Sequence, residues 1–362
     1  MRSRGGSSKV RWLALLLVPL LALALVSNGA GRAATAAVTL PQDESPHPAS
    51  SMEWWYYNGH LAGIDPSGKV HQYGFELSFI RMNAQNTEPA SALYNGQFAI
   101  TDLSRGTYEA DMSEFAQQPD VIPPQGGYNI TIGNWNMNGI NARNNLRAAF
   151  KDGNYGISLS ADQAKPAALH GDGGVIPYGP FGQSYYYSET DLHVSGTVTD
   201  HGIPVRVTGI AWQDHQWGNF SDGTGGWTWF SVQLANDTQY MLYFIHDANG
   251  NLVQVVGTKV NPDGSTVSLP PNEVSETPLG RWTSPTTHIT YPQNWLVKVP
   301  GGQLTVLAQQ ADQEPTTITR AGTPTGYWEG SSTVFGTING LPVGGLSYVE
   351  ITPVFTIPVT LS

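Results

Sequence analysis

The sequence predicts an all-β protein built from barrels or sandwiches, and three observations favour this fold class. Short segments rich in aromatic and β-branched residues recur along the chain, with turn residues between them. No window longer than about two turns shows the 3.6-residue periodicity of an amphipathic helix. Charged residues make up only 12% of the chain, whereas its 41 Gly, 25 Pro, 11 Trp and 16 Tyr suit strands and tight turns.

The first half of the chain is predicted to form a series of hairpins. Its predicted strands are 53–61, 69–81, 96–101, 128–135, 146–150, 155–160, 185–188, 192–199 and 203–212. Turn sequences such as Asp65-Pro66-Ser67-Gly68 separate them. A long loop is expected at 161–182, where eight residues are glycine or proline.

The pattern restarts after a glycine-rich break at 221–226. The predicted strands of the second half are 227–234, 239–246, 251–259, 265–269, 295–299, 303–308, 327–330, 332–338 and 346–351. A chain of this length suggests two domains. We therefore predict one domain over 37–220 and a second over 221–362.

Residues 1–36 are predicted to be a Sec-type secretory signal peptide. Four basic residues precede an apolar run of 15 residues, Trp12–Val26, and small residues at 34–36 offer a cleavage site. A membrane anchor is the alternative, but the run is shorter than the roughly 20 residues that a spanning helix needs. We expect a secreted, extracytoplasmic protein with no membrane insertion after signal cleavage.

The charge and cysteine content restrict the possible partners. Five of the 17 basic residues lie in the signal, which leaves 12 basic and 28 acidic residues and a formal charge of −16. This balance argues against nucleic acid and anionic membrane surfaces as partners. The chain has no cysteine, so its core does not depend on disulfides. The sequence does not indicate an oligomeric state.

Several common motifs of cofactor, metal and nucleophile sites are missing. The segment 63–70 approaches a P-loop, but it lacks the magnesium-binding Ser/Thr and a strand follows it. No Gly-x-Ser-x-Gly or His-Glu-x-x-His sequence occurs, and the nine histidines are scattered. We therefore predict no cofactor and no metal site, and a hydrolase has little support.

Aromatic residues are concentrated in the first strand, Glu53-Trp54-Trp55-Tyr56-Tyr57. Such rings bury well in a core, but here they occupy both faces of the strand, and one face of a barrel strand lines the interior. Core packing and cavity lining are both open on this pattern. The candidate ligand-binding residues are Trp54, Trp55, Tyr57, Tyr187, Trp227 and Trp229.

The densest group of reactive side chains is Asp214-His215-Gln216-Trp217, after the predicted strand 203–212. In an extended chain His215 and Trp217 point to the same side and Asp214 to the other. If the chain bends here, Asp214 and His215 can form a proton-transfer pair. The structural alternative is that the pair fixes the following loop.

Five segments together resemble the AttH/carotenoid 1,2-hydratase (CrtC-like) family. They are 53–61, 187–190, 209–218, 327–330 and 345–350, and their order and spacing agree over nearly the whole mature chain. The resemblance implies two tandem lipocalin-like (calycin-type) antiparallel β-barrels. A boundary near 221–226 fits that organisation.

The same resemblance implies residue roles. Hydratases of the family add water to an isoprenoid double bond without a cofactor, and their His and Trp two residues apart match His215 and Trp217. Their Tyr and Asp two residues apart match Tyr243 and Ile245, so the family's acid is replaced here. The candidate catalytic residues are His215, Asp214, Trp217, Tyr243 and Glu53, with Asp214 as the first choice of acid and Glu53 as the second.

The leading hypothesis is a secreted, cofactor-independent, hydratase-like protein that adds water to a C=C bond of an apolar, isoprenoid or prenylated small molecule. The alternative is a non-catalytic lipocalin-like carrier of a hydrophobic ligand, which needs the same aromatic cavity but no acid. A third hypothesis, an aromatic carbohydrate-binding surface, requires exposed and coplanar rings of Trp54, Trp55, Trp217 and Trp227.

Overall fold

The computed structural model describes residues 37–83, 92–113, 115–220, 225–315, 319–320, 323–324 and 326–353. The predicted signal at 1–36 and most of the glycine-rich break lie outside these ranges. The described chain consists of antiparallel strands and the short 3-10 turns η1 (Gln42–Glu44), η2 (Gly179–Phe181) and η3 (Pro271–Glu273). None of its helical segments is long and apolar enough to cross a membrane. The all-β prediction is confirmed.

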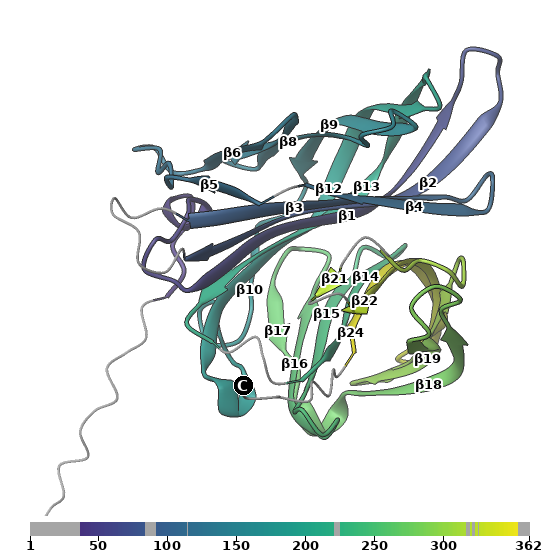
Figure 1. Cartoon of the computed structure of the whole chain (residues 1–362). Helices are drawn as coiled ribbons and strands as arrows, with labels where there is room; N and C mark the ends of the chain where they lie inside the picture. Colours follow the sequence, from purple (N-terminus) through teal and green to yellow (C-terminus); the bar gives the residue numbers. More distant parts are fainter. Residues whose placement is uncertain are drawn as a thin grey trace, which may run out of the picture. The chain divides into compact units, whose positions relative to one another are not determined.

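The first half of the chain forms one antiparallel sheet (Figure 1). Its path of hydrogen-bonded neighbours is β4-β3-β2-β1-β13-β12-β9-β8-β7-β6, with β5 paired to β3 and β10 and β11 paired to β12. The strands are β1 (Met52–Ile64), β2 (Val70–Asn83), β3 (Ala92–Asp102), β4 (Thr107–Met112), β5 (Ala116–Gln118), β6 (Tyr128–Ile132), β7 (Trp135–Ile140), β8 (Arg143–Ala149), β9 (Tyr155–Gln163), β10 (Ala168–Leu169), β11 (Val175–Pro177), β12 (Gln183–Asp200) and β13 (Ile203–Gly218).

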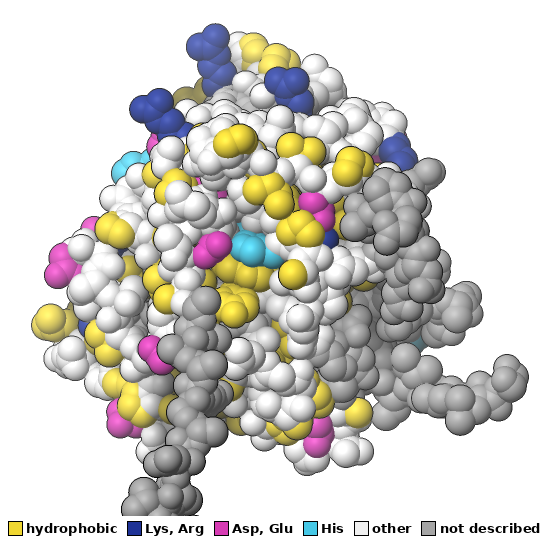
Figure 2. Space-filling view, turned by 90° about the vertical axis from the view of Figure 1, so that its left-hand side faces the viewer, with side chains coloured by type: hydrophobic (Ala, Val, Ile, Leu, Met, Phe, Trp, Pro, Cys, Tyr) yellow, Lys and Arg dark blue, Asp and Glu magenta, His cyan; other side chains and the backbone are white. Residues whose placement is uncertain are grey.

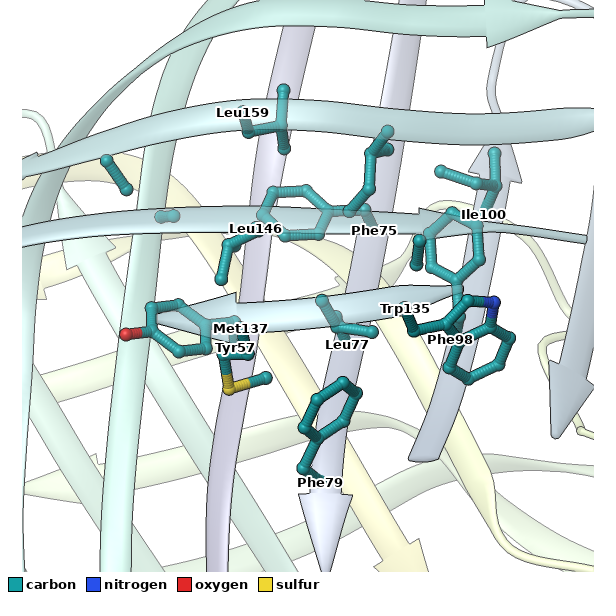
Figure 3. Close-up of a cluster of buried hydrophobic side chains, with 14 of the residues drawn as sticks. Tyr57, Phe75, Leu77, Phe79, Phe98, Ile100, Trp135, Met137, Leu146 and Leu159 are labelled. Carbon is teal, nitrogen blue, oxygen red and sulfur yellow. The ribbon is translucent and has the colours of Figure 1, made fainter. Parts of the chain in front are cut away.

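This sheet folds over on itself around a hydrophobic cluster. Phe98 of β3 meets Trp135 of β7 edge to face at 6.0 Å between ring centroids, although the two strands lie far apart in the strand order. Figure 3 shows the cluster, which includes Tyr57, Phe75, Leu77, Phe79, Phe98, Ile100, Trp135, Met137, Leu146 and Leu159. We call the side of the sheet that carries this cluster the inner face. Side chains, rather than a hydrogen-bonded strand pair, bring β3 and β7 together.

The second half forms a separate antiparallel sheet with the order β17-β16-β15-β14-β24-β23-β20-β19-β18. Its strands are β14 (Trp227–Leu234), β15 (Gln239–His246), β16 (Leu252–Val260), β17 (Thr266–Ser268), β18 (Ser275–Thr283), β19 (Thr290–Val299), β20 (Gly302–Ala308), β23 (Trp328–Ile338) and β24 (Leu341–Thr352). A short pair, β21 (Thr319–Arg320) and β22 (Thr323–Pro324), stands apart from it. The two tandem antiparallel units agree with the predicted lipocalin-like architecture. The change of sheet falls between Gly218 and Trp227, while the division into two domains stays a prediction.

Several local predictions needed correction. β13 does not end at Trp212 but continues to Gly218, because the whole segment is paired on one side with β1 and on the other with β12. The predicted strand 128–135 is two strands separated by a turn at Gly133. β4 and β18, which have little apolar alternation, were not predicted, and the expected loop 161–182 contains β10 and β11.

The segment before β1 lies against the end of the first sheet. The backbone N–H of Gly127 donates to the carbonyl of Pro41, and the Ser45 hydroxyl donates to the carbonyl of Gly127 at 2.7 Å. The indole of Trp55 donates to the carbonyl of Glu44. These contacts hold this segment beside the start of β1 and the end of β13, which pair with each other.

Charged side chains are sparse on the face of the molecule that Figure 2 shows, where hydrophobic groups are scattered among uncharged ones. The low content of charged residues in the sequence is therefore visible on this face of the surface.

Truncation of Phe98 is expected to destabilise the first sheet. Its ring is fully buried and touches both Trp135 and Phe150, so Phe98→Ala should lower the free energy of unfolding by about 3–5 kcal/mol. Urea unfolding measures this change. Phe335→Ala removes a ring that is 52% exposed and should change stability by less than about 1 kcal/mol. Equal losses in the two variants would contradict the packing described here.

Candidate functional site

The strands β1, β13 and β12 lie side by side and display a block of nine side chains on the inner face. Their register aligns three rows across the strands, because successive residues of a strand point to opposite faces. The rows are Glu53–Trp217–Tyr185, Trp55–His215–Tyr187 and Tyr57–Gln213–Glu189. We call this block the inner patch. His215 stands at its centre.

His215 is fully buried and has a partner at each ring nitrogen. Its Nε2 lies 2.8 Å from Oε1 of Glu53, and its Nδ1 lies 3.2 Å from the hydroxyl of Tyr187. An ionised carboxylate only accepts hydrogen bonds, so Nε2 carries the proton and Nδ1 accepts from Tyr187. The ring also stacks on Trp55 at 4.6 Å between centroids. The imidazole is therefore held in one orientation and one tautomer.

The segment before β1 adds a second histidine that the sequence analysis did not select. Nδ1 of His47 lies 2.7 Å from Oε1 of Glu53, and its Nε2 lies 3.4 Å from Oδ1 of Asp43. The His47 ring stacks on Trp217 at 3.9 Å with an angle of 4° between the planes. Asp43, His47, Glu53 and His215 thus form a continuous chain of acid and imidazole groups. The only sequence signal for this group is the closeness of Asp43, His47 and Glu53 along the chain, because 37–51 has no strand or helix pattern.

Burial and the partners within this chain set the protonation states. Burial is the main reason why the pKa of His215 falls to about 4, despite the opposing effect of Glu53, so this ring is neutral at neutral pH. Burial raises the pKa of Glu53, but hydrogen bonds from His215 and His47 outweigh it and the net pKa is lowered. Burial likewise lowers the pKa of His47, but Asp43 and Glu53 more than compensate and the net pKa is raised.

An arginine lies near Oε2, the second carboxylate oxygen of Glu53. Nε of Arg81 lies 3.9 Å from Oε2 of Glu53, but its main partner is Asp120, which it contacts at 2.7 Å and 2.6 Å in a bidentate pair. The guanidinium charge is therefore largely balanced by Asp120, and Glu53 remains available to the two histidines.

A second acid, Glu189, lies at the other end of the inner patch. Oε2 of Glu189 accepts a hydrogen bond of 2.6 Å from the amide of Asn144. In the same row of the inner patch, the hydroxyl of Tyr57 is hydrogen-bonded to the hydroxyl of Tyr128. Burial raises the pKa of Glu189 to about 7, with a further contribution from the charge of Glu44. A carboxyl group that holds its proton near neutral pH thus shares a face with His215. Glu189 lies in the segment 187–190 that resembles the hydratase family, but its place in the sequence alone indicates no role.

Asp214 is the centre of a second group on the opposite face of the same three strands. It accepts hydrogen bonds from the Trp212 indole at 2.6 Å, from the Tyr186 hydroxyl at 2.6 Å and from the Ser188 hydroxyl. Burial raises its pKa to about 7, although these three donors lower it. Because β13 is extended throughout, Asp214 and His215 point to opposite faces and form no proton-transfer pair.

This opposite face packs against the second sheet and contains further buried acids. The Trp229 indole donates to the Tyr186 hydroxyl, and the Tyr56 hydroxyl donates to Oε1 of Glu329. Glu329 lies directly opposite Glu350 on the neighbouring strand. Among the described residues, both carboxyl oxygens of Glu76 and Oε2 of Glu329 lack a hydrogen-bond partner of good geometry. Burial raises the pKa of all these groups, to about 7 for Glu350 and well above the ordinary range for Glu76 and Glu329.

The structure divides the predicted site residues between the two faces. The inner face carries Glu53, Trp55, Tyr57, Tyr187, His215 and Trp217. The opposite face, or the second sheet that packs on it, carries Trp54, Asp214, Trp227, Trp229 and Tyr243. The hydroxyl of Tyr243 contacts that of Tyr178 at 2.6 Å rather than His215. Trp55 and Trp217 are buried and Trp54 and Trp227 are packed in an apolar cluster, so these four rings form no exposed coplanar surface.

Comparison with known proteins places this architecture in a family. The family model described as AttH-like matches residues 32–353, which include every strand of both sheets. The chain belongs to the AttH-like family.

Among similar proteins, kievitone hydratase of Fusarium solani subsp. phaseoli is 26% identical to this AttH-like chain over 230 residues. That match spans 61% of this chain and 64% of the hydratase. The crystal structure of a protein described as AttH from Nitrosomonas europaea has a TM-score of 0.75 and 28% identity, covering 88% of this chain and 97% of its own. The crystal structure of kievitone hydratase from Nectria haematococca has a TM-score of 0.69 and 20% identity, covering 88% of this chain and 94% of its own.

Proposed function

We propose that this protein is a hydratase-like enzyme that adds water to a C=C bond of an apolar small molecule with an isoprenoid or prenyl group. The observation that carries the proposal is the inner patch, where a neutral imidazole oriented by a carboxylate shares a face with a protonated carboxyl group. Its similarity to kievitone hydratase supports the reaction class. The signal peptide predicted at 1–36 supports secretion as part of the proposal.

In this proposal Glu189 supplies the proton and His215 removes one. Glu189 protonates the double bond, and the cation that forms is stabilised by the faces of neighbouring rings such as Trp55; each desolvated cation–π contact contributes about 2 kcal/mol. Water then attacks the cation and gives its proton to the Tyr187 hydroxyl, which passes its own proton to Nδ1 of His215. Glu53 stabilises the imidazolium, as a carboxylate does in a catalytic triad. One water is added, and one proton is returned to Glu189 through solvent.

Glu189 replaces Asp214 and Glu53, the acids that the sequence favoured. Asp214 has a raised pKa but lies on the other face of β13, so it cannot act with His215 on one small molecule. Glu53 lies beside His215, but its lowered pKa keeps it ionised and suits it to orient the imidazole.

A direct test is to incubate the purified protein with kievitone, other prenylated phenolics and acyclic carotenoids, and to look for the mass of one added water. The wild-type chain and His193→Ala should both form the product, because the His193 side chain is 72% exposed. No turnover of any of these compounds would count against the proposal.

Loss of the Glu189 proton donor is expected to slow this reaction. Glu189→Gln keeps the hydrogen-bonding contact to Asn144 but removes the acid, and kcat should fall by about 10²–10⁴-fold. The wild-type rate should also decline as the pH rises through about 7, whereas the variant should lose that dependence. Steady-state assays from pH 5 to 9 give both results, and an unchanged profile in the variant would assign the acid to another residue.

One observation favours a second function, a non-catalytic carrier of a hydrophobic ligand. Ile245, at the position of the family's acid, is buried and packs among apolar and aromatic groups beside Tyr243. A co-purified lipid that leaves the protein chemically unchanged, with equal binding by His215→Ala, would select the carrier.

A further inference from the structure

Two histidines and one carboxylate converge at the edge of the inner patch. Nδ1 of His47 and Nε2 of His215 lie 2.7 Å and 2.8 Å from the same oxygen, Oε1 of Glu53. The three donor atoms all lie within 4.8 Å of one another. Two imidazoles and one carboxylate are a donor set that binds Zn²⁺ and similar divalent cations, with a fourth position left for water.

Each imidazole also has a partner at the ring nitrogen that points away from Glu53. Nε2 of His47 faces Oδ1 of Asp43 at 3.4 Å, and Nδ1 of His215 faces the hydroxyl of Tyr187 at 3.2 Å. In metal sites the nitrogen that does not bind the metal usually has such a partner, which fixes the ring and raises its basicity. Both rings are therefore oriented with one nitrogen directed at a common point.

Charge and access are compatible with a cation at this point. Glu53 and Asp43 contribute two negative charges, while the nearby charge of Arg81 is balanced by Asp120. The Glu53 and His215 side chains are fully buried, whereas the His47 side chain is 20% exposed. An ion would reach the site from the side of His47, where Asp43 is also partly exposed.

We propose that His47, Glu53 and His215 bind one divalent cation of the zinc class, which holds a water molecule at the inner patch. On binding, the neutral ring of His215 would move its proton from Nε2 to Nδ1, which would then donate to the Tyr187 hydroxyl. The proton on Nδ1 of His47 would pass to solvent, while its Nε2–H would remain directed at Asp43. The cation would make the water acidic enough to act as a nucleophile near neutral pH. This catalytic consequence rests on the proposed function, and the metal-bound water would then replace the water activated by His215, because Nδ1 of the metal-bound ring carries its proton. The binding site itself does not rest on the proposed function.

The binding test uses the full mature chain, stripped with a chelator and titrated with Co²⁺ or Zn²⁺. We expect about one Co²⁺ per chain, with visible d–d absorption of a four- or five-coordinate site, and displacement by Zn²⁺. His47→Ala should lose this spectrum, while His288→Ala, which removes a histidine outside the cluster, should keep it. Asp43→Asn keeps all three ligands and should weaken binding by about 10–100-fold. This conservative change provides a second measure in case His47→Ala does not fold.

Two results would overturn the site. One is a folded, stripped chain that binds neither Co²⁺ nor Zn²⁺ at millimolar concentration. The other is unchanged binding in His47→Ala. Water addition by metal-free protein would remove the catalytic consequence and leave hydration to the histidine alone. Stoichiometric binding without turnover of any substrate would instead support the site and contradict the proposed function.

Discussion

Replacement of His215 by glutamine is expected to lower kcat/KM for water addition by about 10²–10⁴-fold. The imidazole is the central side chain of the inner patch, and its lowered pKa, about 4, keeps it neutral and able to accept a proton or bind a cation. Glutamine can still donate a hydrogen bond to Glu53, so the buried carboxylate keeps a partner. Product formation from kievitone or a related prenylated phenolic measures the loss.

The interpretation of this variant depends on its fold. Near-ultraviolet circular dichroism should remain that of the wild type, because Trp55 and Trp217 still pack against the site. Glu53→Gln should also lower kcat/KM for water addition. The double variant should have a kcat/KM only slightly below that of the worse single variant, because the two residues act as one unit. Full additivity would show that they act separately.

Raising the pH from about 5 to 8 is expected to destabilise the contact between the two sheets. Asp214 and Glu350 have pKa values raised by burial from 3.8 and 4.5 to about 7, and those of Glu76 and Glu329 are raised further. These four acids therefore bind more protons in the folded chain than in the unfolded chain, and their contribution to stability falls as the pH rises. His60 and His170, whose pKa values burial lowers to about 4 and about 3, act in the opposite sense only below about pH 6.5, so the decline should be clearest between pH 6.5 and 8. For one group, a pKa that is higher by one in the folded chain than in the unfolded chain changes the free energy of unfolding by about 1.4 kcal/mol across this interval.

Urea unfolding at several pH values measures this dependence. Glu76→Gln removes one ionisable group whose oxygens lack good partners, so it should flatten the decline and be more stable than wild type at pH 8. Glu273→Gln, at an exposed position, should follow the wild-type curve. Glu53 acts in the opposite sense, since its lowered pKa makes its contribution disappear only under acidic conditions. A stability that rises towards pH 8 would contradict protonated acids between the sheets.

The alternation of side chains along a strand made the two faces of β13 predictable from sequence. It correctly placed His215 and Trp217 together and Asp214 apart from them. The strand order was not predictable in the same way, because hydrogen bonds between β1 and β13 join residues more than 100 positions apart. The hairpin of β12 and β13 joins nearer residues, but its register shifts between Glu189 and Leu192, and this shift places Glu189 on the face of His215.

His47 shows a different limit of sequence reasoning. It lies between η1 and β1, in residues that form neither strand nor helix, and its place beside Glu53 follows from contacts of the segment before β1 with the end of the first sheet. The continuation of β13 beyond Trp212 was also missed, because polar residues there resemble a loop in sequence while pairing on both sides makes them part of a strand.

The His215 group and the Asp214 group lie on opposite faces of β13, and this arrangement restricts how the strand can change in evolution. A shift of its pairing by one residue would exchange the two groups, turning Asp214 towards the inner face and His215 towards the second sheet. Substitutions can tune either group alone, whereas an insertion or deletion within the strand alters both at once. A close approach helps to resist such slippage: at Gly209 an added Cβ would lie 1.9 Å from the carbonyl oxygen of His60. In relatives of this chain, length changes should therefore occur in the turns beyond β13 and not within it.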